Sequence, residues 1–292
     1  MNDYQNKAQA PAFDKAEWAA KKKAEREAVF SLIDETAVSL ANDPQMFRKF
    51  LDVQSRFDRY SVSNSLLITA QRPDMTEAAD AKAWNDKGVY VKKGETGTLI
   101  LVPGEEYTKA DGSTAVSFNV KRVFDISQTT AMPVNRPSVQ YDDRLLFRAL
   151  FNDAPCNIKS VEPRDMPVSN VFARYRAEDD TLYVCKGLDT PTLFRAAVNE
   201  LAHAYMKSTP ETYQENDFAA HCVTYVMCQR FHIPNRDFNF DRMPESFKEL
   251  DVKAIRAELS QVRDVSNSIC SGMSPVLEGN NRADKQRSDD AR

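Results

Sequence analysis

Side chains that could bind a metal ion occur at helical spacing in the second half of the chain. Glu200 and His203 fit the glutamate and the second histidine of the pattern H-E-x-x-H, in which two histidines hold Zn²⁺ and the glutamate polarises the metal-bound water. The first position of that pattern is Asn199, whose neutral amide oxygen is a weak ligand for zinc. On the next predicted helix, Asp217 and His221 are four residues apart and should share a face.

These residues allow two interpretations. In the first, His203, Asp217 and His221 bind Zn²⁺, and Glu200 is the catalytic base of a peptidase. In the second, they are hydrogen-bonded residues of an ordinary helix pair, which is the commoner fate of a single histidine on a helix. Spacing alone does not decide between a metal centre and a structural pair.

Aromatic and basic residues interleave in the first half of the chain, between residues 57 and 93. Proteins that bind single-stranded nucleic acid need aromatic faces for base stacking and cations for the phosphates. The interleaved residues are Phe57, Arg59, Tyr60, Arg72, Trp84, Lys87, Tyr90, Lys92 and Lys93. The competing interpretation places the aromatic residues in the core and the lysines on a solvated hairpin.

The elements that must position these residues form two groups. In the first, helices are expected at 15–42, 44–57, 61–71 and 76–84, followed by strands at 89–91, 98–102 and 116–125. In the second, a helix is expected at 142–151, strands at 158–161, 171–176 and 181–185, and helices at 189–210, 211–231 and 244–269. We therefore predict an α+β protein with a leader at 1–14, a first domain at 15–130, a linker at 131–141, a second domain at 142–271 and a disordered tail at 272–292.

Composition narrows the class of protein further. The chain has 292 residues, 42% hydrophobic and 28% charged, which is typical of a globular protein. Its formal net charge of -4 argues against a strongly basic nucleic-acid binder, so any contact with DNA must come from a local patch. Five cysteines without a C-x-x-C pair indicate reduced thiols. The absence of a long apolar run or an apolar leader predicts a cytoplasmic protein with no membrane partner.

An ordered series of short motifs also resembles a known family. The series comprises residues 57–68, Gln71-Arg72-Pro73, Ala83-Trp84, Gly88, residues 91–97 and residues 123–129. Together they are similar to the N-terminal single-stranded-DNA-binding domain of ArdC-type antirestriction proteins and related proteins of conjugative elements. The resemblance covers roughly residues 45–130, and it implies that the first domain binds single-stranded DNA. The residues that we expect to contact DNA are Tyr60, Asn64, Arg72, Trp84, Lys92 and Lys93.

In that family a zincin-like metallopeptidase domain follows the DNA-binding domain. The resemblance therefore implies a zincin-like second domain here, with Glu200 at the catalytic glutamate, His203 at the second histidine ligand and Asp217 at the ligand of the next helix. This sequence departs from the family pattern at Asn199, at Asp217 in place of glutamate, and at His221. The departures imply a degenerate domain or a shifted site.

Three hypotheses about function follow. In the first, the protein is an accessory of a mobile genetic element, such as a conjugative transposon, that binds single-stranded DNA and protects it from restriction. In the second, it is an active zinc-dependent peptidase with a rearranged metal site. In the third, the second domain is a decoy that binds a host restriction or defence protein without cleaving it.

Overall fold

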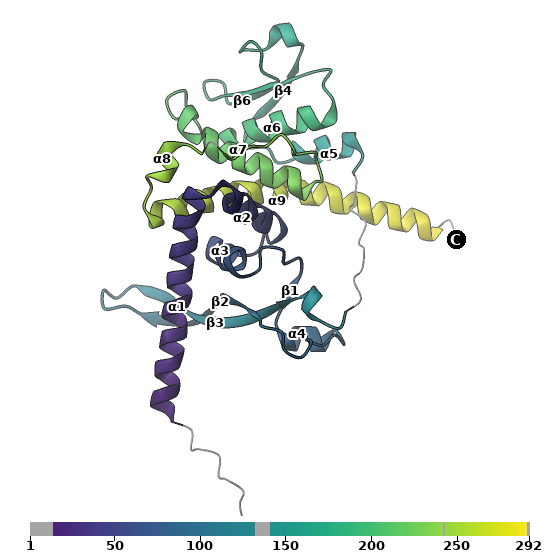
Figure 1. Ribbon diagram of the computed structural model, residues 1–292. Helices are drawn as coiled ribbons and strands as arrows, with labels where there is room; N and C mark the ends of the chain where they lie inside the picture. Colours follow the sequence, from purple (N-terminus) through teal and green to yellow (C-terminus); the bar gives the residue numbers. More distant parts are fainter. Residues whose placement is uncertain (1–13, 132–140, 242, 291–292) are drawn as a thin grey trace, which may run out of the picture.

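The computed structural model describes residues 14–131, 141–241 and 243–290, and it is an α+β protein made of two units (Figure 1). The leader predicted at 1–14 and the linker predicted at 131–141 lie, apart from their end residues, outside the described residues. None of the described helices is both long enough and apolar enough to cross a membrane.

The N-terminal unit begins with three helices whose ends follow the capping residues of the sequence. They are α1 (Lys15–Asn42), α2 (Pro44–Arg56) and α3 (Val62–Gln71). Asp43 separates the first two helices, because its side chain accepts hydrogen bonds from backbone amides at the start of α2 and Pro44 takes the first helical position. The Ser61 hydroxyl caps α3 by accepting from the Asn64 amide. The three predicted helices are confirmed with nearly the predicted bounds.

A three-stranded antiparallel sheet completes this unit, in the order β1-β3-β2. Its elements and the short helices beside them are β1 (Ala78–Ala79), α4 (Ala81–Asp86), β2 (Thr98–Thr108), β3 (Thr114–Asp125) and η1 (Ile126–Gln128). β2 and β3 pair with one irregularity, between Pro103 and Glu106, and form a ribbon that projects beyond the helices (Figure 1). The strand predicted at 89–91 is reduced to one bridge between Val91 and Thr129.

The second unit combines a small sheet with a helix pair. Its elements are α5 (Asp143–Leu150), β4 (Asn157–Val161), η2 (Pro163–Asp165), β5 (Ala173–Arg176), β6 (Thr181–Cys185), α6 (Thr190–Tyr205), α7 (Tyr213–Arg230), α8 (Glu245–Lys248) and α9 (Val252–Asp290). The strand order is β4-β6-β5, with β4 parallel and β5 antiparallel to β6. β5 is therefore an edge strand, and α6 packs against both β5 and α7.

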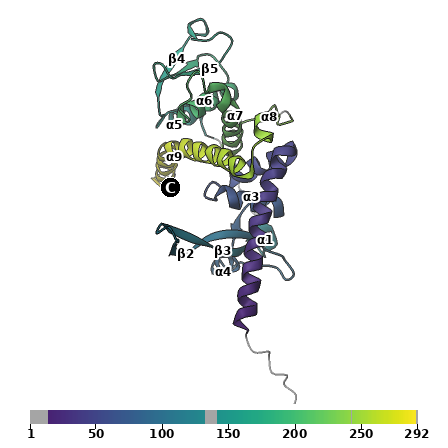
Figure 2. The ribbon, with the colours of Figure 1, turned by 90° about the vertical axis from the view of Figure 1, so that its left-hand side faces the viewer.

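The two units share one hydrophobic core, so they are not separate globules. α2 packs on α7, and α9 contacts helices of both units, lying between them in Figure 2. Polar contacts reinforce this packing: the Asp52 carboxylate accepts from the Tyr225 hydroxyl at 2.6 Å and from the Gln229 side chain at 2.7 Å. The Arg230 guanidinium donates to the carbonyl of Ser55 at 3.2 Å. The base of the N-terminal unit is thereby fixed to α7.

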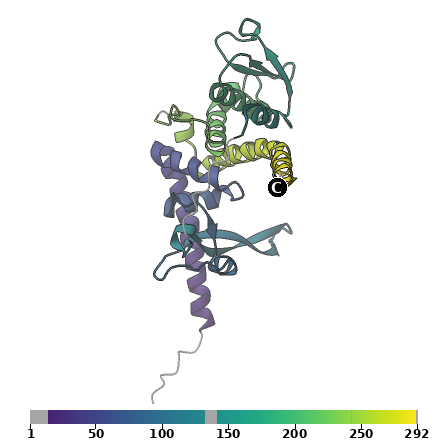
Figure 3. The ribbon, with the colours of Figure 1, turned by 90° about the vertical axis from the view of Figure 1, so that its right-hand side faces the viewer.

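The C-terminal segment corrects two predictions. One helix was expected at 244–269 and a disordered tail at 272–292, whereas the chain forms the short α8 and then α9, which extends to Asp290 (Figure 3). The polar composition of the tail conceals an apolar stripe at helical spacing that continues onto the shared core. The buried residues of this stripe are Val265 and Ile269 before the predicted tail, and Met273 and Leu277 within it.

Asp125 fastens the end of β3 to two neighbouring segments. Its Oδ1 accepts hydrogen bonds from the backbone amides of Thr76 at 2.7 Å and Glu77 at 3.0 Å, and its Oδ2 accepts from the amide of Ser127 at 2.9 Å and from its hydroxyl. The Gln128 side chain accepts from the Asp125 amide at 2.9 Å, which completes a capping box. Burial alone would raise the pKa of this carboxyl, but the hydrogen bonds outweigh burial and lower it to about 2.

Acid should therefore weaken the fold through Asp125. Because the pKa of this carboxyl is about 2 in the folded chain and near 4 in an unfolded one, its contribution is present above pH 4 and is lost as the pH falls toward 2. The difference amounts to about 2 kcal/mol of unfolding free energy. We expect Asp125→Asn to be less stable at pH 7 and to lack this part of the acid dependence, as measured by urea unfolding between pH 7 and pH 2.5.

Asp111→Asn is the matched control for this measurement. Asp111 is an exposed carboxylate that also accepts hydrogen bonds from a serine two residues further on, Ser113. The same kind of hydrogen bonds lower the pKa of Asp111, but water surrounds this carboxylate, so we expect this variant to lose a much smaller part of the acid dependence than Asp125→Asn. An Asp125→Asn profile that runs parallel to the wild-type profile at every pH would contradict the role of Asp125.

Candidate functional site

Glu200 lies on α6, and its carboxylate reaches the edge strand β5. The residue is 7% exposed. Its Oε2 accepts from the backbone amide of Tyr175 at 2.7 Å, and its Oε1 accepts from the Tyr213 hydroxyl at 2.6 Å. Burial raises the pKa of Glu200, although these two donors and the charge of Arg174 oppose the shift. Both oxygens are therefore engaged, and an edge-strand amide that would otherwise lack a protein partner is capped.

His203 stands one turn further along α6 and is completely buried. Its ring stacks on Tyr213, with centroids 3.8 Å apart and planes 10° from parallel. Its Nδ1 lies 3.1 Å from the Ser208 hydroxyl, which accepts a hydrogen bond from the Asn216 side chain at 2.8 Å. Burial lowers the pKa of His203 to about 4, and the positive charge of Arg174 adds to this effect. The imidazole is therefore neutral at pH 7.

The other ring nitrogen of His203 faces Asp217 on α7. Nε2 lies 3.3 Å from the Asp217 Oδ1, which is within ion-pair distance. The two groups are not aligned for a hydrogen bond, and Nε2 has no hydrogen-bond partner among the residues that the structure describes. Because the imidazole is neutral and the Asp217 side chain is 57% exposed, the contact is a weak electrostatic one.

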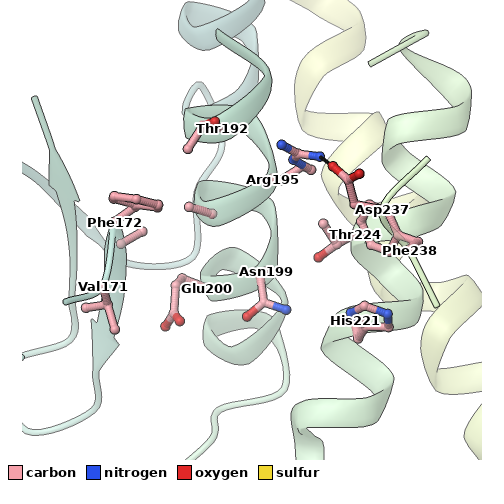
Figure 4. A pocket seen from close by; sticks show the side chains of 12 residues that line it. Val171, Phe172, Thr192, Arg195, Asn199, Glu200, His221, Thr224, Asp237 and Phe238 are labelled. Carbon is pink, nitrogen blue, oxygen red and sulfur yellow. Dashed lines mark hydrogen bonds and ion pairs between the residues drawn. The ribbon is translucent and has the colours of Figure 1, made fainter. Parts of the chain in front are cut away.

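His221 and Asn199 line one pocket of about 460 Å³ between α6, α7 and the segment that leads into β5 (Figure 4). Asn199 points toward α7, where His221 lies, while Glu200 points toward the strand side of the pocket (Figure 4). The His221 ring packs on Phe238 with centroids 4.9 Å apart. Burial lowers the pKa of His221, so this imidazole is also neutral at pH 7. Phe172, which is 50% exposed, lines the opposite wall.

The predicted zinc ligands are therefore not assembled into a centre, which corrects the ligand set of His203, Asp217 and His221. No group of three or more histidine, cysteine, aspartate and glutamate side chains within the described residues could hold a metal ion. His203 contacts Asp217, but the His221 ring is held against Phe238 and Phe240 by packing. Asp217 and His221 line one cavity of about 430 Å³ together with Asn199, but the buried His203 is not part of its lining.

Three residues that build the site were missed in the sequence: Arg174, Ser208 and Tyr213. The Arg174 guanidinium carbon lies 3.8 Å from the centroid of the Tyr213 ring. Arg174 comes from β5, Ser208 from the turn after α6, and Tyr213 from the first residue of α7. No spacing rule connects a strand with the following turn and helix, so the only available signal was a charged residue inside a predicted strand.

Two of the predicted DNA contacts are interior residues, which corrects their assignment. Asn64 is 7% exposed and exchanges two hydrogen bonds of 2.8 Å with the amide and carbonyl of Leu101, so it joins α3 to β2. Trp84 is 2% exposed, and its indole N–H donates to the carbonyl of Phe124 at 3.0 Å. Because neighbouring residues cover almost all of the Trp84 ring, a nucleobase cannot stack on it.

The other candidates differ in accessibility. Tyr60 is half-buried and stacks on Phe57 with centroids 5.5 Å apart, and Arg72 is also half-buried, at the end of α3. Lys92 and Lys93 are exposed, and the Lys92 ammonium donates to a backbone carbonyl at 3.0 Å. Of the predicted DNA contacts, Lys92 and Lys93 are therefore the most accessible to a ligand.

Tyr90 was among the interleaved residues but not among the expected DNA contacts, and the structure exposes it. The residue is 58% exposed and lies two positions before Lys92. Its backbone is held by Thr130, whose hydroxyl accepts from the Tyr90 amide at 3.0 Å and whose amide donates to the Tyr90 carbonyl at 2.8 Å. An exposed ring on a fixed backbone beside two lysines could stack on a nucleobase.

Comparison with known proteins identifies relatives of this fold. Residues 39–134 match the family model described as the N-terminal domain of anti-restriction factor ArdC. The metal-free crystal structure of the antirestriction ArdC protein from the R388 plasmid has a TM-score of 0.50 and 15% identity, covering 74% of this chain and 86% of that chain. The Mn(II)-bound structure of that protein has a TM-score of 0.50 and 13% identity, covering 77% and 97% respectively. None of the curated proteins is similar enough to match.

The Mn(II)-bound relative raises the question of whether the residues of this chain fit a metal ion. The buried Nε2 of His203 beside a carboxylate is one feature that fits. The neutral Asn199 amide at the first ligand position does not fit, and neither does the lack of any three-ligand group among the described residues. The residues present therefore do not complete a metal centre, for zinc or for manganese.

Removing the Tyr213 hydroxyl should destabilise the protein. Tyr213→Phe keeps the ring between Arg174 and His203 but leaves the buried Oε1 of Glu200 without its donor. Because a hydrogen bond to a charged group contributes about 1.5–3 kcal/mol, we expect a loss of about 2 kcal/mol at pH 7. Equilibrium unfolding of the full chain in urea measures this loss.

Tyr183→Phe provides the comparison, since the Tyr183 hydroxyl also donates to a carboxylate, Asp179, at 2.6 Å, but on the exposed surface. Water can replace that donor, so this variant should be nearly as stable as the wild type. An equal loss of unfolding free energy in Tyr213→Phe and Tyr183→Phe would contradict the expectation that burial strengthens the hydrogen bond to Glu200.

Proposed function

We propose that this chain, whose residues 39–134 match the family model of the N-terminal domain of anti-restriction factor ArdC, is an antirestriction protein of a mobile genetic element that binds single-stranded DNA through its N-terminal unit. In this proposal the protein acts in the cytoplasm on incoming DNA. Binding would be largely independent of sequence, because stacking faces and phosphate contacts read no base identity.

The observation that carries the proposal is the exposed Tyr90 beside Lys92 and Lys93. The chain as a whole is acidic, so a DNA site needs a local excess of positive charge. The segment 81–100 contains four lysines, one aspartate and one glutamate, so its formal charge is +2. A stacking ring and adjacent cations on one surface segment are the minimal parts of a single-strand platform.

In the second unit we propose a peptidase-like scaffold that lacks peptidase activity. Both oxygens of Glu200 already accept a hydrogen bond from the protein, and its neighbours among the described residues do not complete a metal centre. The pocket beside Glu200 favours the protein-binding hypothesis as a second candidate, because the half-exposed Phe172 and the neutral His221 offer a contact surface without chemistry. Its occupant would be a host restriction or defence protein.

Anisotropy of a labelled oligothymidylate tests DNA binding directly. We expect Tyr90→Ala to weaken binding by about tenfold, because a stacked base contributes about 1–3 kcal/mol. We expect Lys93→Gln to weaken binding and to reduce the slope of log affinity against log salt by about 0.7, because one phosphate contact is lost. Both variants should unfold at the wild-type urea concentration, since both side chains are exposed.

Tyr107→Ala and Lys109→Gln are the matched controls. Tyr107 is 51% exposed and Lys109 is exposed, and both lie toward the tip of the β2–β3 ribbon, away from residue 90 in the sequence and the sheet. These two variants should bind DNA like the wild type. The proposed site would be refuted if the control variants lost as much DNA affinity as Tyr90→Ala and Lys93→Gln. It would also be refuted if the wild type showed no salt-dependent binding.

A further inference from the structure

The second unit contains a permanent cation next to its buried acidic residue, and this cation is not a metal ion. We propose that, in contrast to the Mn(II)-bound relative, this chain offsets the charge of the buried Glu200 with the Arg174 guanidinium, and that Asn199 is the residue that closes the site to divalent metals. The proposal concerns the second unit alone and does not depend on whether the N-terminal unit binds DNA.

Arg174, Tyr213 and His203 form a three-layer stack. The Arg174 guanidinium carbon and the His203 ring centroid each lie 3.8 Å from the centroid of the Tyr213 ring. Two groups at that distance cannot occupy the same face of one ring, so Arg174 and His203 must cover opposite faces. The guanidinium is thus held by a cation–π contact, and the completely buried His203 is closed on one side by the Tyr213 ring.

The charge of the buried Glu200 carboxylate is offset without a metal ion. The Tyr213 ring that carries Arg174 also donates its hydroxyl to Glu200, so the cation and the buried carboxylate are tied to one side chain. Burial raises the pKa of both Glu200 and Asp217, and the positive charge of Arg174 opposes that shift. Arginine keeps its proton at any physiological pH, so this charge is permanent.

The surroundings of His203 favour a ring proton on the nitrogen that would bind a metal. The Ser208 hydroxyl accepts from the Asn216 side chain and can donate its own proton to Nδ1 of His203, 3.1 Å away. The tautomer with the proton on Nε2 is the favoured one, because an Nε2 lone pair would face the Asp217 carboxylate at 3.3 Å. A metal-binding histidine has the reverse arrangement, with the second nitrogen donating its proton away from the metal.

A single substitution at Asn199 should be enough to create a metal-binding site. It lies one position before Glu200 and one helical turn before His203, and its side chain points toward α7 (Figure 4). Asn199→His would add an imidazole one turn from His203, and the Ser208 hydroxyl can rotate to accept rather than donate. His203, Asp217 and the new histidine would then supply three protein ligands.

Metal binding by the full chain tests the proposal. Metal-stripped protein is titrated with Mn²⁺, followed by electron paramagnetic resonance of the free ion, and with Zn²⁺, followed by calorimetry. We expect the wild type to bind less than about 0.1 equivalent of either ion and its melting temperature to be insensitive to chelator. Asn199→His should acquire about one equivalent, which the double variant Asn199→His/His203→Ala should lose.

Stoichiometric binding by the wild type that His203→Ala abolishes would overturn the proposal. Failure of Asn199→His, folded as judged by circular dichroism, to bind either ion would equally overturn the role assigned to Asn199. Neither result would bear on single-stranded DNA binding, which is measured separately on the N-terminal variants.

The role of Arg174 has its own test. Arg174→Met keeps a long side chain over Tyr213 but removes the charge, and it should lower the melting temperature by about 4 °C or more at pH 7. Arg176→Met is the matched control on the same strand, because both arginines are partly exposed but Arg176 pairs with the exposed Glu178 and Asp179 instead of lying over Tyr213. A loss with Arg174→Met no larger than that with Arg176→Met would contradict the proposal.

Discussion

A buried carboxylate must be surrounded by donors or it will not stay charged, and in the second unit this requirement determines how three elements meet. Glu200 comes from α6, and its two donors come from the edge of β5 and the start of α7. Tyr213, which supplies one of these donors, is also the ring on which His203 and Arg174 stack. Moving any of these elements would leave a buried charge or a buried ring nitrogen without its neighbours.

The second constraint is the shared core of the two units. α9 returns from the second unit and packs along α1 and α3, and α2 packs on α7. Arg256 of α9 donates to the Ser63 hydroxyl of α3 at 3.0 Å, so the contact is polar at its edge as well as apolar in its centre. The surface at Tyr90 and the pocket at His221 therefore lie on two units that share a core, and a change of stability in one unit should be felt in the other.

Most helices and strands could be predicted from the sequence, because the interactions that begin and end them lie within a few residues. Asp43 before Pro44, and Ser61 at the start of α3, end and begin helices through contacts within a few residues. The tail was mispredicted because its average polarity hid a stripe that only the distant core makes useful. Propensity and periodicity describe what a segment prefers, whereas the partner that stabilises it can be far away in the sequence.

The candidate sites show the same division between local pattern and distant partner. The spacing from Glu200 to His203 predicted that the two residues serve one site, and the structure buries both, but the spacing could not show that Tyr175 and Tyr213 occupy the two oxygens of Glu200. Trp84 satisfied the composition of a stacking residue and is instead covered by packing. Residue type and spacing specify which chemistry a side chain could perform. Whether it can perform it depends on its exposure and on whether its polar atoms are still free to bind a ligand.

In the E-x-x-H segment, Glu200 caps the edge strand, and His203 fills the space between Ser208 and the Tyr213 ring. Packing alone is therefore a sufficient reason for these residue types at these positions. The segment becomes evidence for catalysis only where a third ligand converges on the free ring nitrogen, and Asn199, on the adjacent turn of α6, is a neutral amide directed toward α7.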